Sequence, residues 1–228
     1  DYIFDHHDIC PELYEAKFGK TTGMFYKSQL WLERQTYKHC KFAFVTNESY
    51  KKIAIERGGM KAEDVFVLRS GPKLERLKIQ EPKSEIKRGK KFMVGYLGVI
   101  GQQEGIEYLL KAAKYVKELP ERNDVFWGIV GGGPDLERMK KLCHEMGLDD
   151  IVEFTGRVPD QKLLDYLNTA DVCVNCDEYN AMNDKSTMNK VLEYMALGKP
   201  LVQFDLTEGR YSAQDASLYA EHNNANDM

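Results

Sequence analysis

The sequence predicts an α/β protein with two domains, each built on a parallel β-sheet. Short β-rich runs alternate with helical patterns along almost the whole chain, which is typical of parallel sheets with helices on both faces. The chain has 228 residues, 43% of them hydrophobic, and is long enough for one large domain or two small ones. A charged stretch breaks the alternation at residues 72–91, so we place the domain boundary there.

The first part of the chain has the pattern of a βαβαβ unit. Its predicted strands are YIFD (2–5), KFAFVT (41–46) and VFVLRSG (65–71). Its predicted helices are FYKSQLWLERQTYKHC (25–40) and SYKKIAIERGG (49–59). The following stretch, PKLERLKIQEPKSEIKRGKK, contains prolines and lacks sustained periodicity. We therefore expect a partial first domain at residues 1–75 and a linker at residues 76–91.

The alternation then restarts and predicts a second domain at residues 92–228. The predicted strands are FMVGYLGV (92–99), VFWGIV (125–130), IVEFTG (151–156), VCVNC (172–176) and PLVQFD (200–205). The predicted helices are GIEYLLKAAKYVKEL (105–119), DLERMKKLCHEMG (135–147), QKLLDYLNTA (161–170) and TMNKVLEYMALG (187–198), followed by SAQDASLYA (212–220). Ligands of such sheets bind outside the carboxyl ends of the strands, so the loops there are the places to search.

Composition narrows the classes of function. A net charge of -4 and a pI near 5.8 argue against nucleic acid as the main partner. The run FMVGYLGVIG is too short to cross a bilayer. The five cysteines form no regular framework, which favours the reducing cytoplasm. Cys173 and Cys176 are better explained as buried small side chains than as metal ligands, because no second CxxC occurs.

Both ends of the sequence resemble interior segments. It opens on DYIFDHHD, with neither methionine nor signal peptide, and closes on NNANDM, which has the pattern of a helix just beginning. We therefore expect a fragment of a longer protein, with part of any site outside it.

Two glycine-rich loops are candidate phosphate sites. GGGPDLERM follows the strand VFWGIV and includes Gly133; its glycines permit close backbone approach to a phosphate at a helix N-terminus. A dinucleotide fingerprint fails, because Leu136 stands where its third glycine is needed. In GVIGQQEG, the amides of Gly101 and Gln102 can contact a phosphate, although the loop carries Glu104 and no cation. The alternative for GGGPDLERM is a simple strand-to-helix turn.

The helix predicted within NDKSTMNKVLEYMALGKP (183–200) has a polar edge. Ser186 or Thr187 is its expected N-cap, and Gly198 ends it. The expected core stripe is Met188, Val191, Leu192 and Met195, and the expected polar side is Ser186, Asn189, Lys190 and Glu193. On that side Lys190 can meet a phosphate and Glu193 the hydroxyls of a ribose. An ordinary i, i+3 surface pair is an equally open alternative.

The stretch DHHD ends the first strand with two adjacent histidines. Alternation along a strand sends His6 and His7 to opposite faces, so the pair does not suit one metal ion. One histidine at the strand's tip is a candidate site residue, and a structural histidine with satisfied hydrogen bonds is the alternative.

Several stretches, taken in order, resemble glycosyltransferase family 4, retaining sugar transferases of the GT-B fold. They are DHHDICPELYEAKFG, GGGPDLERMKKLCHEMGLDDIVEFTGRVP, LLDYLNTADVCV and NKVLEYMALGKPLV. The resemblance implies two Rossmann-like domains, of which this chain lacks the first part of the acceptor domain and the C-terminal end. It implies a sugar nucleotide bound by the second domain and transfer without a metal. The family's ribose-binding glutamate falls on Glu193, and its histidine near sugar and acceptor falls on His7.

Two departures from the family pattern concern charge. The family has a second glutamate eight positions before the first, but Lys185 stands there, with Asp184 beside it. The family's basic pair, which neutralises the diphosphate, falls on Val99 and Glu104, and neither is basic.

A diphosphate buried without cations is costly. We therefore expect Lys185, Lys190 and Arg210 to supply positive charge together with helix N-termini. Asp184 is the candidate to replace the missing carboxylate. The Lys190→Ala variant should then bind nucleotide several-fold more weakly, and unchanged affinity would contradict this expectation.

The function implied by the resemblance is transfer of a sugar, of the hexosyltransferase type, from a UDP- or GDP-sugar to a glycan, lipid-linked or other glycoconjugate acceptor. Polysaccharide biosynthesis in the cytoplasm is the expected setting, at the inner face of the membrane if parts outside this chain make peripheral contact. The basic cluster KRGKK (87–91) is either a lipid contact or a solvated linker. Two other functions stay open: a sugar-nucleotide epimerase of the same architecture, and a non-catalytic nucleotide-binding module. The fragment itself can also be inactive.

Overall fold

The computed structural model describes residues 2–228, which form two compact units. Unit 1 contains the chain up to Gly71 together with Asn180–Thr187, and unit 2 contains Pro72–Tyr179 and Met188–Met228. The segment Asn180–Thr187 lies in the part of the sequence that predicts the second domain, yet it packs within unit 1. Asn47 holds it there, because its Nδ2 donates to the Lys185 carbonyl at 2.9 Å and lies 3.1 Å from the Thr187 hydroxyl.

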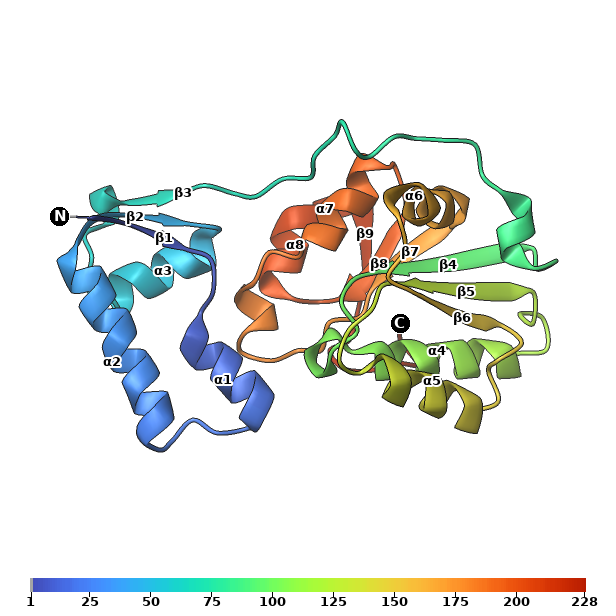
Figure 1. The fold of residues 1–228 in the computed structure, drawn as a ribbon, viewed down its shortest axis with the longest axis horizontal. Helices are drawn as coiled ribbons and strands as arrows, with labels where there is room; N and C mark the ends of the chain where they lie inside the picture. Colours follow the sequence, from blue (N-terminus) through green and yellow to red (C-terminus); the bar gives the residue numbers. More distant parts are fainter. Residues whose placement is uncertain (1) are drawn as a thin grey trace. The chain divides into compact units, whose positions relative to one another are not determined.

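Unit 1 has a three-stranded parallel sheet in the order β1-β2-β3. The strands are β1 (Tyr2–His6), β2 (Cys40–Val45) and β3 (Val65–Val67), and the helices are α1 (Cys10–Phe18), α2 (Met24–His39), α3 (Glu48–Glu56) and the 3₁₀ turn η1 (Ala62–Asp64). Figure 1 shows α2 and α3 on the same side of this sheet. The predicted βαβαβ order is confirmed. Helix α1 was not predicted, although Pro11 in its first turn favours a helix start.

Unit 2 has a six-stranded parallel sheet in the order β6-β5-β4-β7-β8-β9. The strands are β4 (Phe92–Leu97), β5 (Val125–Val130), β6 (Val152–Gly156), β7 (Val172–Asn175), β8 (Leu201–Phe204) and β9 (Ser217–Ala220). Because β5 and β7 lie on opposite sides of β4, the strand order reverses between β4 and β7. Crevices at such a reversal are where open α/β sheets bind ligands.

The helices of unit 2 cover both faces of its sheet. They are α4 (Ile106–Glu118), α5 (Leu136–Glu145), α6 (Asp160–Thr169), α7 (Asn189–Ala196) and α8 (Thr207–Ala213), with 3₁₀ turns η2 (Ser84–Lys87), η3 (Gln102–Glu104), η4 (Asn183–Lys185, in unit 1) and η5 (Gln214–Ala216). Figure 1 shows α4 and α5 on one face and α6, α7 and α8 on the other. Two apolar clusters fill the two interfaces, one around Tyr96 and Ile129 and the other around Phe126 and Tyr194.

The stretch expected to be a linker is fastened to unit 2. The backbone amide of Gln80 donates to the Asn168 side chain at 3.0 Å, and that of Lys83 donates to the Thr169 hydroxyl at 2.9 Å. Lys87 forms an ion pair with Asp171 at 2.7 Å. These bonds run along α6 and the turn after it, so residues 72–91 belong structurally to unit 2.

Two predictions about the second domain are wrong. Helix α7 begins at Asn189 after Met188, which makes no side-chain cap, because Ser186 and Thr187 are engaged by Tyr50 and Asn47 of unit 1. The expected helix at NNANDM is absent from the described residues, where the last eight positions form turns and coil. Helix α8 was not predicted.

The two histidines of DHHD have different environments, as alternation predicts. His6 is 3% exposed; its Nε2 donates to the Asp8 carbonyl at 3.0 Å, and its Nδ1 accepts from the Tyr37 hydroxyl at 2.6 Å. Burial lowers the pKa of His6 to about 4, with the nearby Arg57 guanidinium adding to the effect. His7 is exposed and pairs with Asp5 at 3.0 Å. His6 is therefore a neutral structural residue that fixes the end of β1.

This environment makes unit 1 sensitive to acid. The folded pKa of His6 lies below the unfolded value of 6.5, so the unfolded chain takes up a proton first as pH falls below 6.5. We expect the free energy of unfolding to drop by about 2 kcal/mol between pH 7 and pH 5 from this group alone. An NMR titration should show one imidazole with a midpoint near 4.

The control for this prediction is His144→Gln, which changes an exposed histidine. It should keep the acid dependence of urea unfolding, whereas His6→Gln should reduce it. A His6 midpoint near its ordinary value would contradict the prediction.

Candidate functional site

The glycine loops at the carboxyl edge of the unit 2 sheet pack directly on each other. Gly98 N donates to the Val130 carbonyl and Ile100 N to the Gly132 carbonyl, both at 3.1 Å. A Cβ on Gly131, whose φ is +140°, would lie 1.8 Å from the Gly98 oxygen. One on Gly133 would lie 2.3 Å from the Ile100 oxygen. These glycines are therefore required by the contact between the loops, whatever ligand they also approach.

A cavity of about 610 Å³ opens beside these loops. We call it the glycine-loop cavity; it is lined by Arg76, Leu97–Val99, Val130–Gly133, Arg157, Val158, Asp160 and Leu163. Arg76 forms a bidentate bond with Asp160, at 2.6 and 2.7 Å. Arg157 has no ion pair within residues 2–228 of the structure. With two arginines and one aspartate on its wall, the cavity suits an anionic group.

Glu193 of α7 lies beside the glycine-loop cavity. Burial raises the pKa of this half-buried carboxyl group, Arg76 lowers it and Asp160 raises it. Both neighbours line the cavity, so Glu193 is within electrostatic reach of its wall. A partly buried carboxylate in this place can accept hydrogen bonds from ligand hydroxyl groups.

Lys190 is buried at the reversal of strand order, where it joins two loops. Its Nζ lies 2.7 Å from Asp177 Oδ1 and 2.9 Å from Glu104 Oε2. Nζ also lies 5.2 Å from the ring centroid of Tyr96. Glu104 belongs to the loop after β4 and Asp177 to the loop after β7. We call Lys190, Glu104 and Asp177 the Lys190 cluster.

The Lys190 cluster carries one excess negative charge when all three groups are ionised. Burial raises the pKa of Asp177 to about 7, and Glu104 adds to the increase, while Lys190 opposes it. For Lys190 itself, burial lowers the pKa, but the adjacent carboxylates outweigh that effect and hold it well above its ordinary value. The lysine is thus a permanent cation whose charge is already shared by two carboxylates.

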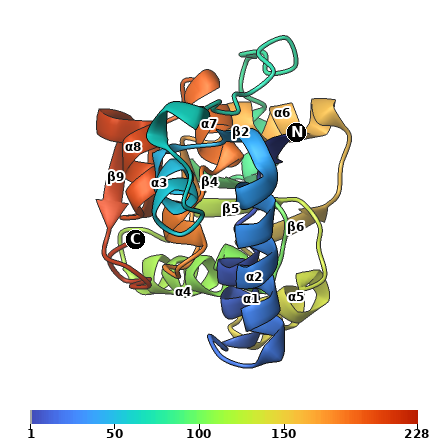
Figure 2. The ribbon, with the colours of Figure 1, turned by 90° about the vertical axis from the view of Figure 1, so that its left-hand side faces the viewer.

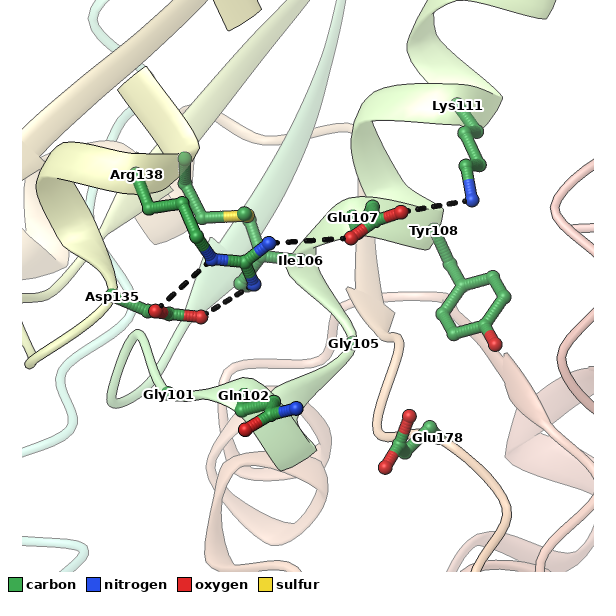
Figure 3. Close-up of a pocket in the computed structure, with 11 residues that line it drawn as sticks. Gly101, Gln102, Gly105, Ile106, Glu107, Tyr108, Lys111, Asp135, Arg138 and Glu178 are labelled. Atoms are coloured by element: carbon green, nitrogen blue, oxygen red, sulfur yellow. Dashed lines mark hydrogen bonds and ion pairs between the residues drawn. The ribbon is translucent and has the colours of Figure 1, made fainter. Parts of the chain in front are cut away.

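A second cavity, of about 440 Å³, opens at the N-terminal ends of α4 and α5. Gly101 and Gln102 line this cavity instead of the glycine-loop cavity. Figure 3 shows its cations turned toward carboxylates: Arg138 bonds Asp135 at 2.6 Å, and Lys111 pairs with Glu107 at 3.1 Å.

Glu178 also lines this second cavity. Three carboxylates therefore face two cations on its wall. An anionic ligand is disfavoured there in comparison with the glycine-loop cavity.

Other residues predicted from the sequence are not among the residues that line these two cavities. His7, Asp184 and Lys185 belong to unit 1, where Lys185 Nζ donates to the Ala181 carbonyl at 3.0 Å and lies 3.9 Å from Glu12. Arg210 is exposed on α8, bonds Asp205 at 2.6 Å and stacks on Tyr219. Within unit 2, Gly133 lines the glycine-loop cavity, Glu193 interacts electrostatically with two residues of its wall, and Lys190 bonds to the neighbouring loops.

Sequence reasoning missed Arg76, Arg157 and Asp177. Arg157 and Asp177 each follow the carboxyl end of a strand, which is the position that parallel sheets use for ligands, so that position could have found them. Arg76 could not be found in this way, because it lies in residues 72–91, which have the composition of a solvated linker.

Residues 2–228 contain neither a metal-ligand cluster nor a helix that could span a membrane. Those residues contain no group of three or more histidine, cysteine, aspartate or glutamate side chains arranged to hold a metal ion. They also contain no helix with the length and apolarity that a membrane crossing requires.

Comparison with known proteins identifies the family. Residues 78–216, more than half of the chain, match the family described as group 1 glycosyl transferases. An uncharacterized glycosyltransferase of Methanocaldococcus jannaschii is 23% identical over 193 residues, which cover 82% of this chain and 46% of that protein. The GDP-mannose-dependent alpha-(1-6)-phosphatidylinositol monomannoside mannosyltransferase of Mycobacterium tuberculosis is 41% identical over 76 residues, or 32% of this chain and 20% of that protein.

Solved structures share the fold at low sequence identity. HepE of Anabaena, in complex with UDP and glucose, matches with a TM-score of 0.77 at 16% identity over 99% of this chain and 59% of that one. Sucrose-phosphate synthase of Thermosynechococcus elongatus matches with a TM-score of 0.75 at 18% identity over 99% of this chain and 56% of that one. The predicted fold of two parallel-sheet domains of GT-B type is confirmed. The chain spans about half the length of these proteins.

The Lys190 cluster makes a direct prediction about stability. Replacing Lys190 with methionine leaves the buried Asp177 and the partly buried Glu104 without their cation. We expect a loss of about 3–5 kcal/mol in the free energy of unfolding, measured by urea titration. The control Lys140→Met removes an exposed pair with Glu137 and should cost no more than about 1 kcal/mol. Equal stability of the two variants would contradict the burial of this charge.

Proposed function

Because the chain belongs to the family of group 1 glycosyl transferases, we propose that it is the donor-binding part of a retaining glycosyltransferase. The proposed donor is a nucleoside diphosphate sugar. The observation that carries the proposal is the glycine-loop cavity at the carboxyl edge of a parallel sheet, which is lined by closely packed glycines and by Arg157, an arginine with no ion pair among the described residues. The half-buried Glu193 interacts electrostatically with two residues of its wall, Arg76 and Asp160. That combination suits a ligand with both phosphates and sugar hydroxyl groups.

In the proposed complex, Glu193 accepts hydrogen bonds from the ribose hydroxyl groups. Arg157 faces the phosphates, because it lines the cavity and has no ion pair within residues 2–228. Arg76 is hydrogen-bonded to Asp160. It therefore acts on the phosphates through the electrostatic field of its charge, because its guanidinium group already has a carboxylate partner. The backbone of Gly133 permits the close approach that a diphosphate needs.

The proposed chemistry is the departure of the nucleoside diphosphate from the sugar while an acceptor hydroxyl attacks from the same face. Stabilising the leaving diphosphate is the largest contribution that such a site makes. Lys190 is a buried cation whose charge is shared by the carboxylates of Asp177 and Glu104. We assign His7 to the sugar or the acceptor and Asp184 to the role of the family's missing carboxylate. Lys185 and Arg210 remain proposed cations, and transfer without a metal rests on the family resemblance.

The proposed base of the donor is uridine or guanosine. The M. tuberculosis relative depends on GDP-mannose, and HepE was solved with UDP-glucose and with UDP and glucose. The proposed acceptor is a glycan or a lipid-linked glycoconjugate, with polysaccharide synthesis at the cytoplasmic face of the membrane as the setting. One observation favours a second candidate, a non-catalytic nucleotide-binding module. Glu104 stands where the resemblance places a basic residue, and its carboxylate forms an ion pair with Lys190.

Binding of UDP and GDP, with NAD as the unrelated nucleotide, tests the donor site. We expect calorimetry to show binding of UDP or GDP to the 228-residue chain and none of NAD. Glu193→Gln and Arg157→Gln should each weaken binding by about tenfold or more, since each removes a charged hydrogen-bond partner worth roughly 1.5–3 kcal/mol. The effect of Arg157→Gln should shrink at high salt.

The control for these variants is Arg122→Gln, which removes an exposed arginine outside the cavity and should leave affinity unchanged. Binding that survives both cavity variants would place the nucleotide elsewhere. Binding of UDP or GDP without sugar transfer by the longer protein, supplied with donor and glycan acceptors, would favour the non-catalytic module.

A further inference from the structure

Helix α2 of unit 1 turns a row of large apolar side chains outward. Met24 is 82% exposed, Phe25 70%, Trp31 60% and Leu32 54%. Their spacings of one, six, seven and eight residues place all four on one side of a helix. The other side of α2 packs in unit 1 through Glu33 and Tyr37, which are buried. Figure 2, which looks at unit 1 from the front, shows α2 running along the outside of that unit.

Cations border this apolar row. At 100° per residue, Lys27, Arg34 and Lys38 fall on a stripe of α2 between the apolar row and the buried side, and all three are exposed. The helix carries one carboxylate, Glu33, which is buried and bonded to Arg57 at 2.6 Å. The outward surface of α2 is therefore apolar and basic with no acidic side chain.

The same chemistry continues onto the turn between α1 and α2. Phe18 at the end of α1 is 60% exposed, and Lys17 and Lys20 beside it are exposed as well. Helix α1 packs against α2. The outward row of α2 and this turn form one surface, which we call the α2 surface.

We propose that the α2 surface binds an anionic lipid bilayer. Apolar side chains that include a tryptophan, bordered by lysine and arginine on an amphipathic helix, match the chemistry of the membrane interface: the apolar groups enter the acyl boundary and the cations meet anionic headgroups. Each cation near such a surface contributes attraction that salt screens. The helix lies in the plane of the membrane and does not cross it.

Charge argues for lipid over a second copy of this chain. The protein has a net charge of -4, yet the charged groups on the α2 surface are cations. A symmetric dimer through this surface would bring identical rows of cations together, which is repulsive. A bilayer with anionic headgroups is complementary to both the apolar and the basic part. This proposal goes beyond the proposed sugar transfer and does not depend on it.

Tryptophan fluorescence tests the proposal, because the chain has two tryptophans in opposite environments. Trp127 is 5% exposed and Trp31 is 60% exposed, so the Trp127→Phe variant reports on Trp31 alone. Vesicles of equal parts phosphatidylcholine and phosphatidylglycerol should shift its emission to shorter wavelength and protect it from iodide. Pure phosphatidylcholine should give a weaker change, and added salt should reverse part of the anionic effect.

Vesicle co-sedimentation of the unmodified chain gives a second measurement that does not require Trp127→Phe to fold. The double variant Phe25→Ser, Trp31→Ser and the double variant Lys27→Glu, Arg34→Glu should each lower partitioning into anionic vesicles by about tenfold or more. The matched control is Leu218→Ser, since Leu218 is also an exposed apolar residue, at 74%, but lies in unit 2. It should partition as the unmodified chain does.

Three results would overturn the proposal. One is the absence of both the spectral shift and co-sedimentation with anionic vesicles. Another is equal binding by the Phe25 and Trp31 double variant, the Leu218→Ser control and the unmodified chain. The third is a blue shift of Trp31 that follows protein concentration without vesicles, with a dimer mass in sedimentation, which would assign the surface to a second copy. Nucleotide binding is measured separately, so failure here leaves the proposed donor site untouched.

Discussion

The ion cluster around Lys190 is the interaction on which the loops at the carboxyl edge of the unit 2 sheet depend. It ties the loop after β4, through Glu104, and the loop after β7, through Asp177, to helix α7. These strands are neighbours at the reversal of strand order, where helices leave the sheet toward opposite faces. A buried lysine without carboxylates would lose its charge or its position. With them, it holds two loops that contribute lining residues to the two cavities.

The same cluster explains how the chain tolerates Glu104 at a position where the family pattern has a basic residue. Glu104 at that place would repel a diphosphate if it stood alone. Lys190 lies 2.9 Å from it and offsets part of its charge, because it also pairs with Asp177, and Arg157 adds a cation on the cavity wall. The positive charge is therefore carried by Lys190 of α7 and by Arg157 of the loop after β6. The cost is the excess carboxylate of Asp177, whose raised pKa records its burial.

The sequence predicted most elements of the fold because strand and helix periods differ and the turns between them contain glycine. It failed where tertiary contacts override the local pattern. Lys190 was placed on the polar edge of its helix, but it is buried beside Val191 and Tyr194, because its charge is satisfied by residues distant in sequence. Ser186 and Thr187 have the composition of an N-cap, yet unit 1 engages them. Glu193, which spacing placed on the same polar side, is half-buried, and its role at a ribose stays a prediction.

The membership of Asn180–Thr187 in unit 1 separates the proposed site residues into two groups. Lys185 and Lys190 are five positions apart, but the carbonyl of Lys185 is held by Asn47 and the amino group of Lys190 by Asp177. A change that unfolds unit 1 therefore removes the support of His7, Asp184 and Lys185 while Glu193 and Lys190 keep their partners within unit 2. The residues proposed for sugar transfer come from both units, whereas the proposed nucleotide binding through Glu193 and Arg157 uses residues of unit 2 alone.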